Sequence, residues 1–244
     1  MWIHLELKSK ITEFTAQVWR IVESQSQSST LKITDSLDDQ QILEKLLEET
    51  KPVLPEIANG FHYLISTPFR YKPYPHGSRF RKAGQPEGAY YASLSPETAI
   101  AEMAFYRMLF YSHSPDAILP ENGAEYTAFQ VGVKTPYALD LTEEPFVAML
   151  ELLLKEDYHA CQELADAARA AGVQAIISQS VRCPKKGDNI TVFDMKAFTS
   201  KEPKKTQTWR LHPSRDKVIA LREFPRLSLE YRADNFNDPR ISQK

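Results

Sequence analysis

Three polar residues lie at short intervals around a glycine-rich bend in residues 76–107: Arg79, Tyr91 and Glu102. An arginine is suited to bidentate recognition of phosphate, and a planar tyrosine can stack on an aromatic base. A carboxylate can hydrogen-bond to ribose hydroxyls or stabilise the positive charge of an oxocarbenium-like transition state. Gly77, in "GSRF", permits close approach of the backbone to a ligand. These residue types together indicate chemistry on a dinucleotide.

Glu102 also has a purely structural interpretation. It is the one carboxylate in the small and apolar run "TAIAEMAFY", so it could lie at a helix edge and reach water or pair with Arg107. Its neighbourhood favours a cleft, because the short connection "LSP" leads from a strand that ends at Tyr91 and Ser93 directly into this helix. Both interpretations stay open at this point.

The elements that position these residues can be predicted from caps and patterns. Residues 89–93 predict a strand, and Ser95 as N-cap with Pro96 at the first helical position predicts the helix that holds Glu102. Further predicted strands are 62–66, 125–133, 173–178 and 189–193, and further helices are one capped by Ser36 and ended by Pro52 and one from Asp157 to Gly172. Strands and helices mix without regular βαβ alternation, so we predict an α+β fold.

Composition limits the classes of protein to consider. The 244 residues are 42% hydrophobic and 25% charged, as in an ordinary globular protein, and the net charge of −2 gives no reason to expect direct nucleic-acid binding. Two cysteines form neither a disulfide framework nor a metal motif. Neither a signal peptide nor a membrane span is expected, so we predict a soluble, cytoplasmic protein without a bound metal. The motifs of P-loop, dinucleotide-fold, zinc and serine hydrolase enzymes do not occur.

The last 44 residues differ from the rest. Residues 201–244 carry 11 Lys and Arg residues against 6 Asp and Glu residues, a net charge of +5, and show little periodicity. We predict that this basic segment packs on the domain or faces a partner, with a solvated surface as the alternative.

Three runs of the sequence resemble the RES domain family, the toxins of RES–Xre toxin–antitoxin pairs. They are "VWRIVESQ" at residues 18–25, "GSRF" followed by "YYASLSPETAIAE" at 77–102, and "SQSVRCPKKGDNITVF" at 178–193. The resemblance implies a single domain with a mixed β-core flanked by helices, similar to the ADP-ribosyltransferase fold. We expect an N-terminal extension at residues 1–17, a catalytic domain at 18–200 and the C-terminal segment at 201–244.

The resemblance also implies an activity. Family members degrade NAD⁺, several by phosphorolysis to nicotinamide and ADP-ribose-1″-phosphate, so NAD⁺ is the expected substrate and inorganic phosphate the expected co-substrate, with no separate cofactor. Hydrolysis by water is the other expected outcome. A protein ADP-ribosyltransferase of the same fold and a non-catalytic binding module stay as alternatives. An Xre-type antitoxin that covers the active site is the expected partner, and a homodimer is possible.

Family positions transfer to individual residues of this chain. The resemblance assigns catalytic roles to Glu102, Arg79, Tyr91 and Ser180, and substrate-binding roles to Arg20, Tyr90, Arg182, Asn189 and Arg70. Three of these residues have structural alternatives. Arg20 could be a surface arginine, Ser180 could cap the turn after a strand, and Arg70 could serve the fold alone.

Overall fold

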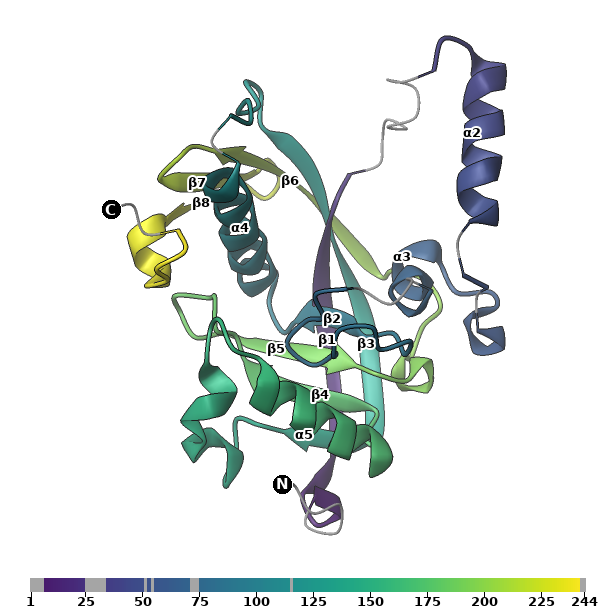
Figure 1. Cartoon of the computed structure of the whole chain (residues 1–244), viewed down its shortest axis with the longest axis vertical. Coiled ribbons are helices and arrows are strands. Elements are labelled where there is room, and N and C mark those ends of the chain that lie inside the picture. The colour runs from purple at the N-terminus through teal and green to yellow at the C-terminus, as the bar shows by residue number, and fades with distance from the viewer. Residues whose placement is uncertain are drawn as a thin grey trace.

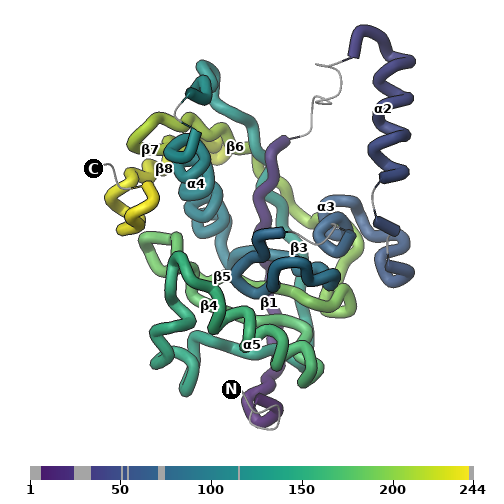
Figure 2. Tube along the Cα trace, in the orientation of Figure 1, coloured from purple at the N-terminus to yellow at the C-terminus, as the bar shows by residue number. Residues whose placement is uncertain are grey.

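The computed structural model describes residues 7–241 except 25–33, 51, 54, 71–74 and 115. Its strands are β1 (Ile11–Glu23), β2 (Tyr90–Ser93), β3 (Ala124–Asp140), β4 (Ala175–Gln179), β5 (Asp188–Val192), β6 (Lys205–Pro213), β7 (Lys217–Arg222) and β8 (Leu227–Arg232). Its helices are α2 (Leu37–Glu49), α3 (Tyr63–Ser66), α4 (Pro96–His113), α5 (His159–Ala170) and the 3₁₀ turn η7 (Ala233–Phe236), among further short 3₁₀ turns. Figures 1 and 2 show these elements around one large sheet.

The eight strands follow the order β1-β2-β5-β4-β3-β6-β7-β8, and β1 also pairs with β3. The first five strands therefore close into a ring, from which β6, β7 and β8 extend. The long strand β3 makes this possible because it pairs with β6 along residues 124–130 and with β4 only at 138–140. The β3–β4 pair is parallel and the other pairs are antiparallel. The predicted α+β fold, one mixed sheet flanked by helices, is confirmed.

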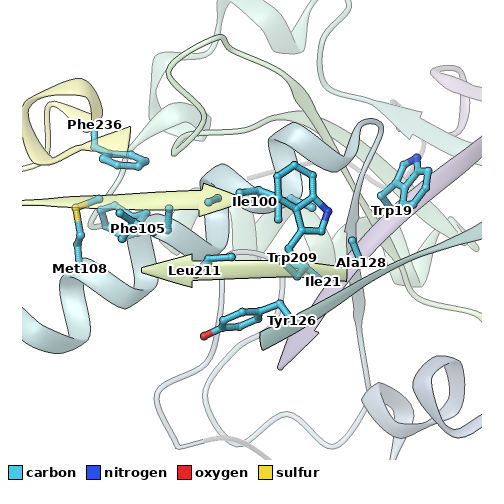
Figure 3. Packing of buried hydrophobic residues seen from close by; sticks show 14 of the residues in the cluster. Trp19, Ile21, Ile100, Phe105, Met108, Tyr126, Ala128, Trp209, Leu211 and Phe236 are labelled. Carbon is cyan, nitrogen blue, oxygen red and sulfur yellow. The ribbon is translucent and has the colours of Figure 1, made fainter. Parts of the chain in front are cut away.

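Two helices cover different parts of the sheet and bury separate cores. Helix α4 packs on the extended part, where Phe105 and Met108 lie among side chains of β6 and η7 such as Trp209 and Phe236 (Figure 3). Helix α5 packs over β3 and β4, and Leu164 contributes to the same cluster as Ile176. Burial of these apolar faces is the main source of stability for both helices.

Three sequence expectations need correction or comment. Residues 62–66 form the short helix α3 and not a strand, because the His62 side chain accepts a hydrogen bond from the backbone N–H of Leu64 and caps a helical turn. The C-terminal segment contains three strands that the sequence analysis did not identify, and they extend the sheet. The predicted boundary between residues 17 and 18 falls within β1.

Helix α2 begins where it was predicted, with Ser36 as N-cap. None of its residues is buried, and Figure 1 shows it standing away from the sheet. Its apolar residues are exposed, for example Leu37 at 70%.

Candidate active site

Local sequence fixes the junction that carries Glu102. The Ser95 side chain accepts the backbone N–H of Thr98 at 3.1 Å, and Pro96 occupies the first turn of α4. Both features start the helix immediately after β2. Because Ala99 and Ile100 are buried, this turn of α4 lies against the sheet, and Glu102 is held at the end of the strands.

Glu102 is fixed by two hydrogen bonds to a single oxygen. Ser180 Oγ donates to Glu102 Oε1 at 2.5 Å, and Asn189 Nδ2 donates to the same oxygen at 2.6 Å. Ser93 Oγ donates to Asn189 Oδ1 at 2.7 Å, which orients the amide so that its NH₂ group points to the carboxylate. Oε2 has no hydrogen-bond partner among the described residues. The carboxylate is thus oriented and keeps one oxygen for a ligand.

Ser180 is itself oriented by the turn that follows β4. The backbone N–H groups of Arg182 and Cys183 donate to Ser180 Oγ at 3.1 and 2.8 Å. Gly187 lets this turn approach α4 closely, because a Cβ atom there would meet Thr98 Oγ1 at 2.1 Å. Capping of the turn, the structural alternative for Ser180, is therefore observed together with the contact to Glu102.

The loop that carries Arg79 is held by Tyr91. The Tyr91 hydroxyl accepts the Phe80 backbone N–H at 3.1 Å and lies 2.7 Å from Ser78 Oγ. Burial raises the pKa of the Tyr91 phenol, although the hydrogen bond with Ser78 opposes the shift, so the hydroxyl is neutral at pH 7. At Gly77 (φ +64°) a Cβ atom would lie 2.7 Å from the Arg81 carbonyl oxygen. The glycine is required by the tight loop itself, and the approach of a ligand to it stays a prediction.

Two arginine side chains reach this region, and each keeps N–H groups that make no hydrogen bond to the protein. Arg79 donates from Nη1 to the Gln179 carbonyl at 2.8 Å and from Nη2 to the Leu152 carbonyl at 2.9 Å. Arg20 donates from Nη1 to the Tyr91 carbonyl at 2.7 Å. The Nε atoms of both arginines are buried without a hydrogen-bond partner. Each guanidinium has five N–H donors, so the backbone contacts orient the groups without exhausting them.

A pocket of about 350 Å³ lies among these residues, within the roughly 300–1,000 Å³ typical of small-molecule sites. Six of the nine predicted residues line it: Arg20, Arg79, Tyr91, Glu102, Arg182 and Asn189. Ser180 contacts the pocket through its hydrogen bond to Glu102. Seven of the nine therefore come together in one place.

Two predicted substrate-binding residues do not line the pocket. Tyr90 is fully buried in the cluster with Phe198, because alternate residues of a strand point to opposite faces and Tyr91 occupies the pocket face. Arg70 bonds the Pro52 carbonyl and Glu48, so it serves the fold near α2. Both residues therefore lie outside the pocket, contrary to the expectation from sequence.

Arg182 and Arg107 have partners that the sequence did not reveal. Arg182 lines the pocket, but its Nη1 donates to Asp238 at 2.5 Å and its Nη2 donates to the Tyr158 hydroxyl at 2.8 Å. Both of its terminal nitrogens are thus bound to protein groups, and its expected substrate-binding role stays a prediction. Arg107 pairs with Glu23 at 2.5 Å and not with Glu102, so the helix-edge ion pair is not formed.

Several residues that were not predicted from the sequence also line the pocket, notably Ser178 and Thr191. Both side chains are 1% exposed, and their hydroxyl oxygens have no hydrogen-bond partner. Thr191 pairs with Tyr91 in the strand register, and Ser178 pairs with Asn189. The signal that could have found them is the period-2 alternation of strands, since residues directly opposite in register share one face.

In the part of the chain that the structure describes, no group of three or more His, Cys, Asp or Glu residues could hold a metal ion. No helix within the described ranges is long and apolar enough to cross a membrane.

The fold and the pocket define a single-sheet α+β protein with a fixed carboxylate and unpartnered donors at one site. The sequence model of the RES domain matches residues 53–214, more than half of the chain. The chain belongs to the RES domain family. No curated protein matches it. A chain in the crystal structure of the M. tuberculosis MbcT–MbcA toxin–antitoxin complex is similar, with a TM-score of 0.47 and 12% identity over 98% of this chain and 97% of that one.

Proposed function

We propose that the protein is an NAD⁺-consuming toxin of a toxin–antitoxin pair, which cleaves the bond between nicotinamide and ribose. The observation that carries the proposal is the fixation of Glu102 by Ser180 and Asn189 through one oxygen, beside a pocket lined by Arg20 and Arg79. A carboxylate held in this way cannot turn to solvent, so its charge is available where a ligand binds.

In the proposed reaction the bond between C1″ of the ribose and the nicotinamide nitrogen breaks. Its electron pair leaves with nicotinamide, and positive charge develops on the ribose carbon and ring oxygen, as in glycoside cleavage. A phosphate oxygen then forms the new bond to C1″, giving ADP-ribose-1″-phosphate; with water as acceptor the product is ADP-ribose and a proton is released. Glu102 stabilises the developing charge through Oε2 and binds the ribose hydroxyls.

Arg20 and Arg79 bind the anionic parts of the reactants in this proposal. Each guanidinium makes only one or two hydrogen bonds to backbone carbonyls, which leaves terminal N–H donors for a ligand. Charged donors of this kind bond phosphate oxygens more strongly than neutral ones. Tyr91 lines the same pocket and offers an aromatic face, while its hydroxyl holds the loop of Arg79. An adenine or nicotinamide ring can stack on such a face.

The remaining expectations are part of the same proposal. Membership of the family supports an Xre-type antitoxin that covers the pocket, and a cytoplasmic location follows from the presence of NAD⁺ there. The homodimer stays a prediction.

The test is nicotinamide release by the purified full-length protein, with and without inorganic phosphate. Release that depends on phosphate, with ADP-ribose-1″-phosphate as product, supports phosphorolysis, and phosphate-independent ADP-ribose supports hydrolysis. Labelled ADP-ribose on a protein would support a transferase instead. If the protein turns over no NAD⁺ under any of these conditions, the proposal is refuted and the non-catalytic binding module is favoured.

A further inference from the structure

Hydrogen bonds and the covalent side chain of Arg182 together join the C-terminal segment to Glu102. Asp238 Oδ2 accepts from Arg182 Nη1 at 2.5 Å, the Arg182 backbone N–H donates to Ser180 Oγ at 3.1 Å, and Ser180 donates to Glu102 at 2.5 Å. Asp238 lies 56 residues after Arg182 in the sequence. In Figures 1 and 2 the yellow C-terminal segment accordingly lies beside the turn between β4 and β5.

The ion pair between Arg182 and Asp238 is fully buried. The Arg182 side chain is 1% exposed and that of Asp238 is 0% exposed, and the Arg182 guanidinium also lies 4.1 Å from the centre of the Phe105 ring. Burial alone would raise the pKa of Asp238, but hydrogen bonds from Arg240 and the charge of Arg182 hold that pKa below its ordinary value. Asp238 is therefore an anion at neutral pH, and removing its charge leaves a buried arginine uncompensated.

The C-terminal segment is clamped around this pair. Lys155 Nζ donates to the carbonyl oxygens of Phe236 and Asn237 at 2.5 and 2.9 Å. Arg240 donates to Asp238 Oδ2 at 2.7 Å and to the Lys155 carbonyl at 3.0 Å. These contacts hold Asp238 in place independently of Arg182.

The hydrogen-bonding capacity of a hydroxyl explains how the ion pair between Arg182 and Asp238 affects Glu102. A serine hydroxyl has two lone pairs and one proton. The backbone N–H groups of Arg182 and Cys183 occupy the acceptor positions of Ser180 Oγ, so the proton is directed to Glu102. This orientation lasts only while the 180–183 turn is fixed. The Arg182 side chain, bound to Asp238, contributes to this together with the backbone bonds Ser180 N–H to the Gly187 carbonyl at 2.8 Å and Lys186 N–H to the Cys183 carbonyl at 2.9 Å.

We infer that Asp238 is a positioning residue for Glu102, which acts through the side chain of Arg182 and the hydroxyl of Ser180. The inference rests on the proposed function for its kinetic test. It extends the active site beyond residues 53–214, the part matched by the family, because Asp238 lies outside that range.

The experiment compares Asp238→Asn, Ser180→Ala and the double variant in nicotinamide release, with thermal melts of each. Asp238→Asn keeps the shape and removes the charge; we expect kcat to fall about 10-fold while KM stays within about 3-fold, since small misplacement of a reacting group lowers turnover. In the Ser180→Ala background, Asp238→Asn should lower kcat by less than about 2-fold, because the two residues act in one chain. The loss of melting temperature caused by Asp238→Asn should be as large in the Ser180→Ala background as in the wild type.

The matched control is Phe236→Leu. This buried residue of the same segment packs on Phe105 through its ring, and the substitution keeps the backbone carbonyl that Lys155 bonds. At a similar loss of melting temperature it should keep kcat within about 2-fold of wild type. Equal kcat losses in Phe236→Leu and Asp238→Asn, or additive kcat effects in the double variant, would overturn the inference. If Asp238→Asn does not fold, Arg240→Gln is the milder variant, with a smaller loss of kcat that also disappears in the Ser180→Ala background.

A second measurement does not need turnover. Hydrogen exchange of the Arg182 and Cys183 amides, both bound to Ser180 Oγ, should be faster in Asp238→Asn and unchanged in Phe236→Leu. Wild-type protein that releases no nicotinamide would refute the proposed function alone. Unchanged exchange at both amides in folded Asp238→Asn would overturn the positioning role.

Discussion

Two groups of polar residues around the pocket differ in how far their hydrogen bonds are satisfied. In the glutamate cluster (Glu102, Ser180, Asn189 and Ser93), every member is joined to another by a bond of 2.5–2.7 Å. The donor cluster (Arg20, Arg79, Ser178 and Thr191) contains buried polar atoms without any partner. Of the nine such atoms among the described residues, five belong to residues that line this pocket.

The difference indicates a division of roles. An unpaired buried polar atom costs about 1–3 kcal/mol, so a concentration of them around one pocket favours a site whose side chains shift to complete these bonds when a ligand binds. A carboxylate held by two hydrogen bonds to one oxygen is already in its final orientation and needs no reorganisation when charge develops nearby. We therefore expect substitutions in the glutamate cluster to lower kcat, and substitutions in the donor cluster to raise KM.

The largest effect is expected from Glu102→Gln. Glutamine keeps the shape and much of the hydrogen bonding but removes the negative charge, so kcat should fall about 10²–10³-fold while NAD⁺ affinity changes little. Steady-state nicotinamide release measures both quantities, and a thermal melt establishes that the variant is folded. Glu97→Gln, five residues earlier on α4 and outside the pocket, is the matched control and should retain wild-type kcat. Near-wild-type kcat in folded Glu102→Gln would return Glu102 to the role of a helix-edge residue.

Arg79→Ala tests the donor cluster. Loss of a charged donor to an anionic substrate should raise KM about 10-fold or more, and kcat should fall by no greater factor. Arg70→Ala is the control, because Arg70 is an arginine of the same domain that bonds Pro52 and Glu48 outside the pocket. It should leave KM unchanged. If Arg79→Ala lowers kcat without raising KM, Arg79 acts in turnover as Glu102 does, and the two clusters do not differ in role.

Much of the glutamate cluster was predictable because local chemistry fixes it. Ser95 and Pro96 mark the start of α4, the strand before it has a clear pattern, and the family motifs contain Ser180 and Asn189. The helix α3 was missed because a run of four residues is too short to show a period, and the cap by His62 depends on geometry.

Other features depend on contacts distant in sequence. Strands β6 and β7 do alternate, with Trp209 and Leu211 buried on β6 and Val218 and Ala220 buried on β7. Each strand is short, however, and the net positive charge of the segment drew attention away from this alternation. The ion pair of Arg182 with Asp238 joins two segments that only the folded sheet brings together. No local pattern indicates it.

The smallest effect, and the sharpest contrast between the clusters, is expected from Thr191→Val. The Thr191 hydroxyl is buried and has no partner, so replacing it by a methyl group should leave the melting temperature unchanged or raise it slightly. The hydroxyl is closed to solvent in this structure, so a substrate bonds it only if neighbouring side chains shift on binding. With that shift the same change removes one hydrogen bond, and KM should rise about 3–10-fold with kcat within about 2-fold. Thr135→Val is the matched control: its fully buried hydroxyl donates to Gln174 at 2.6 Å and accepts from the Tyr137 backbone, far from any pocket residue in sequence. Thr135→Val should lower the melting temperature, because loss of the hydroxyl leaves the Gln174 side chain and the Tyr137 backbone N–H without their hydrogen-bond partner. KM should be unchanged. If Thr191→Val instead destabilises the free protein as Thr135→Val does, the Thr191 hydroxyl has a protein partner, and the unpartnered atoms of the pocket cease to mark a binding site.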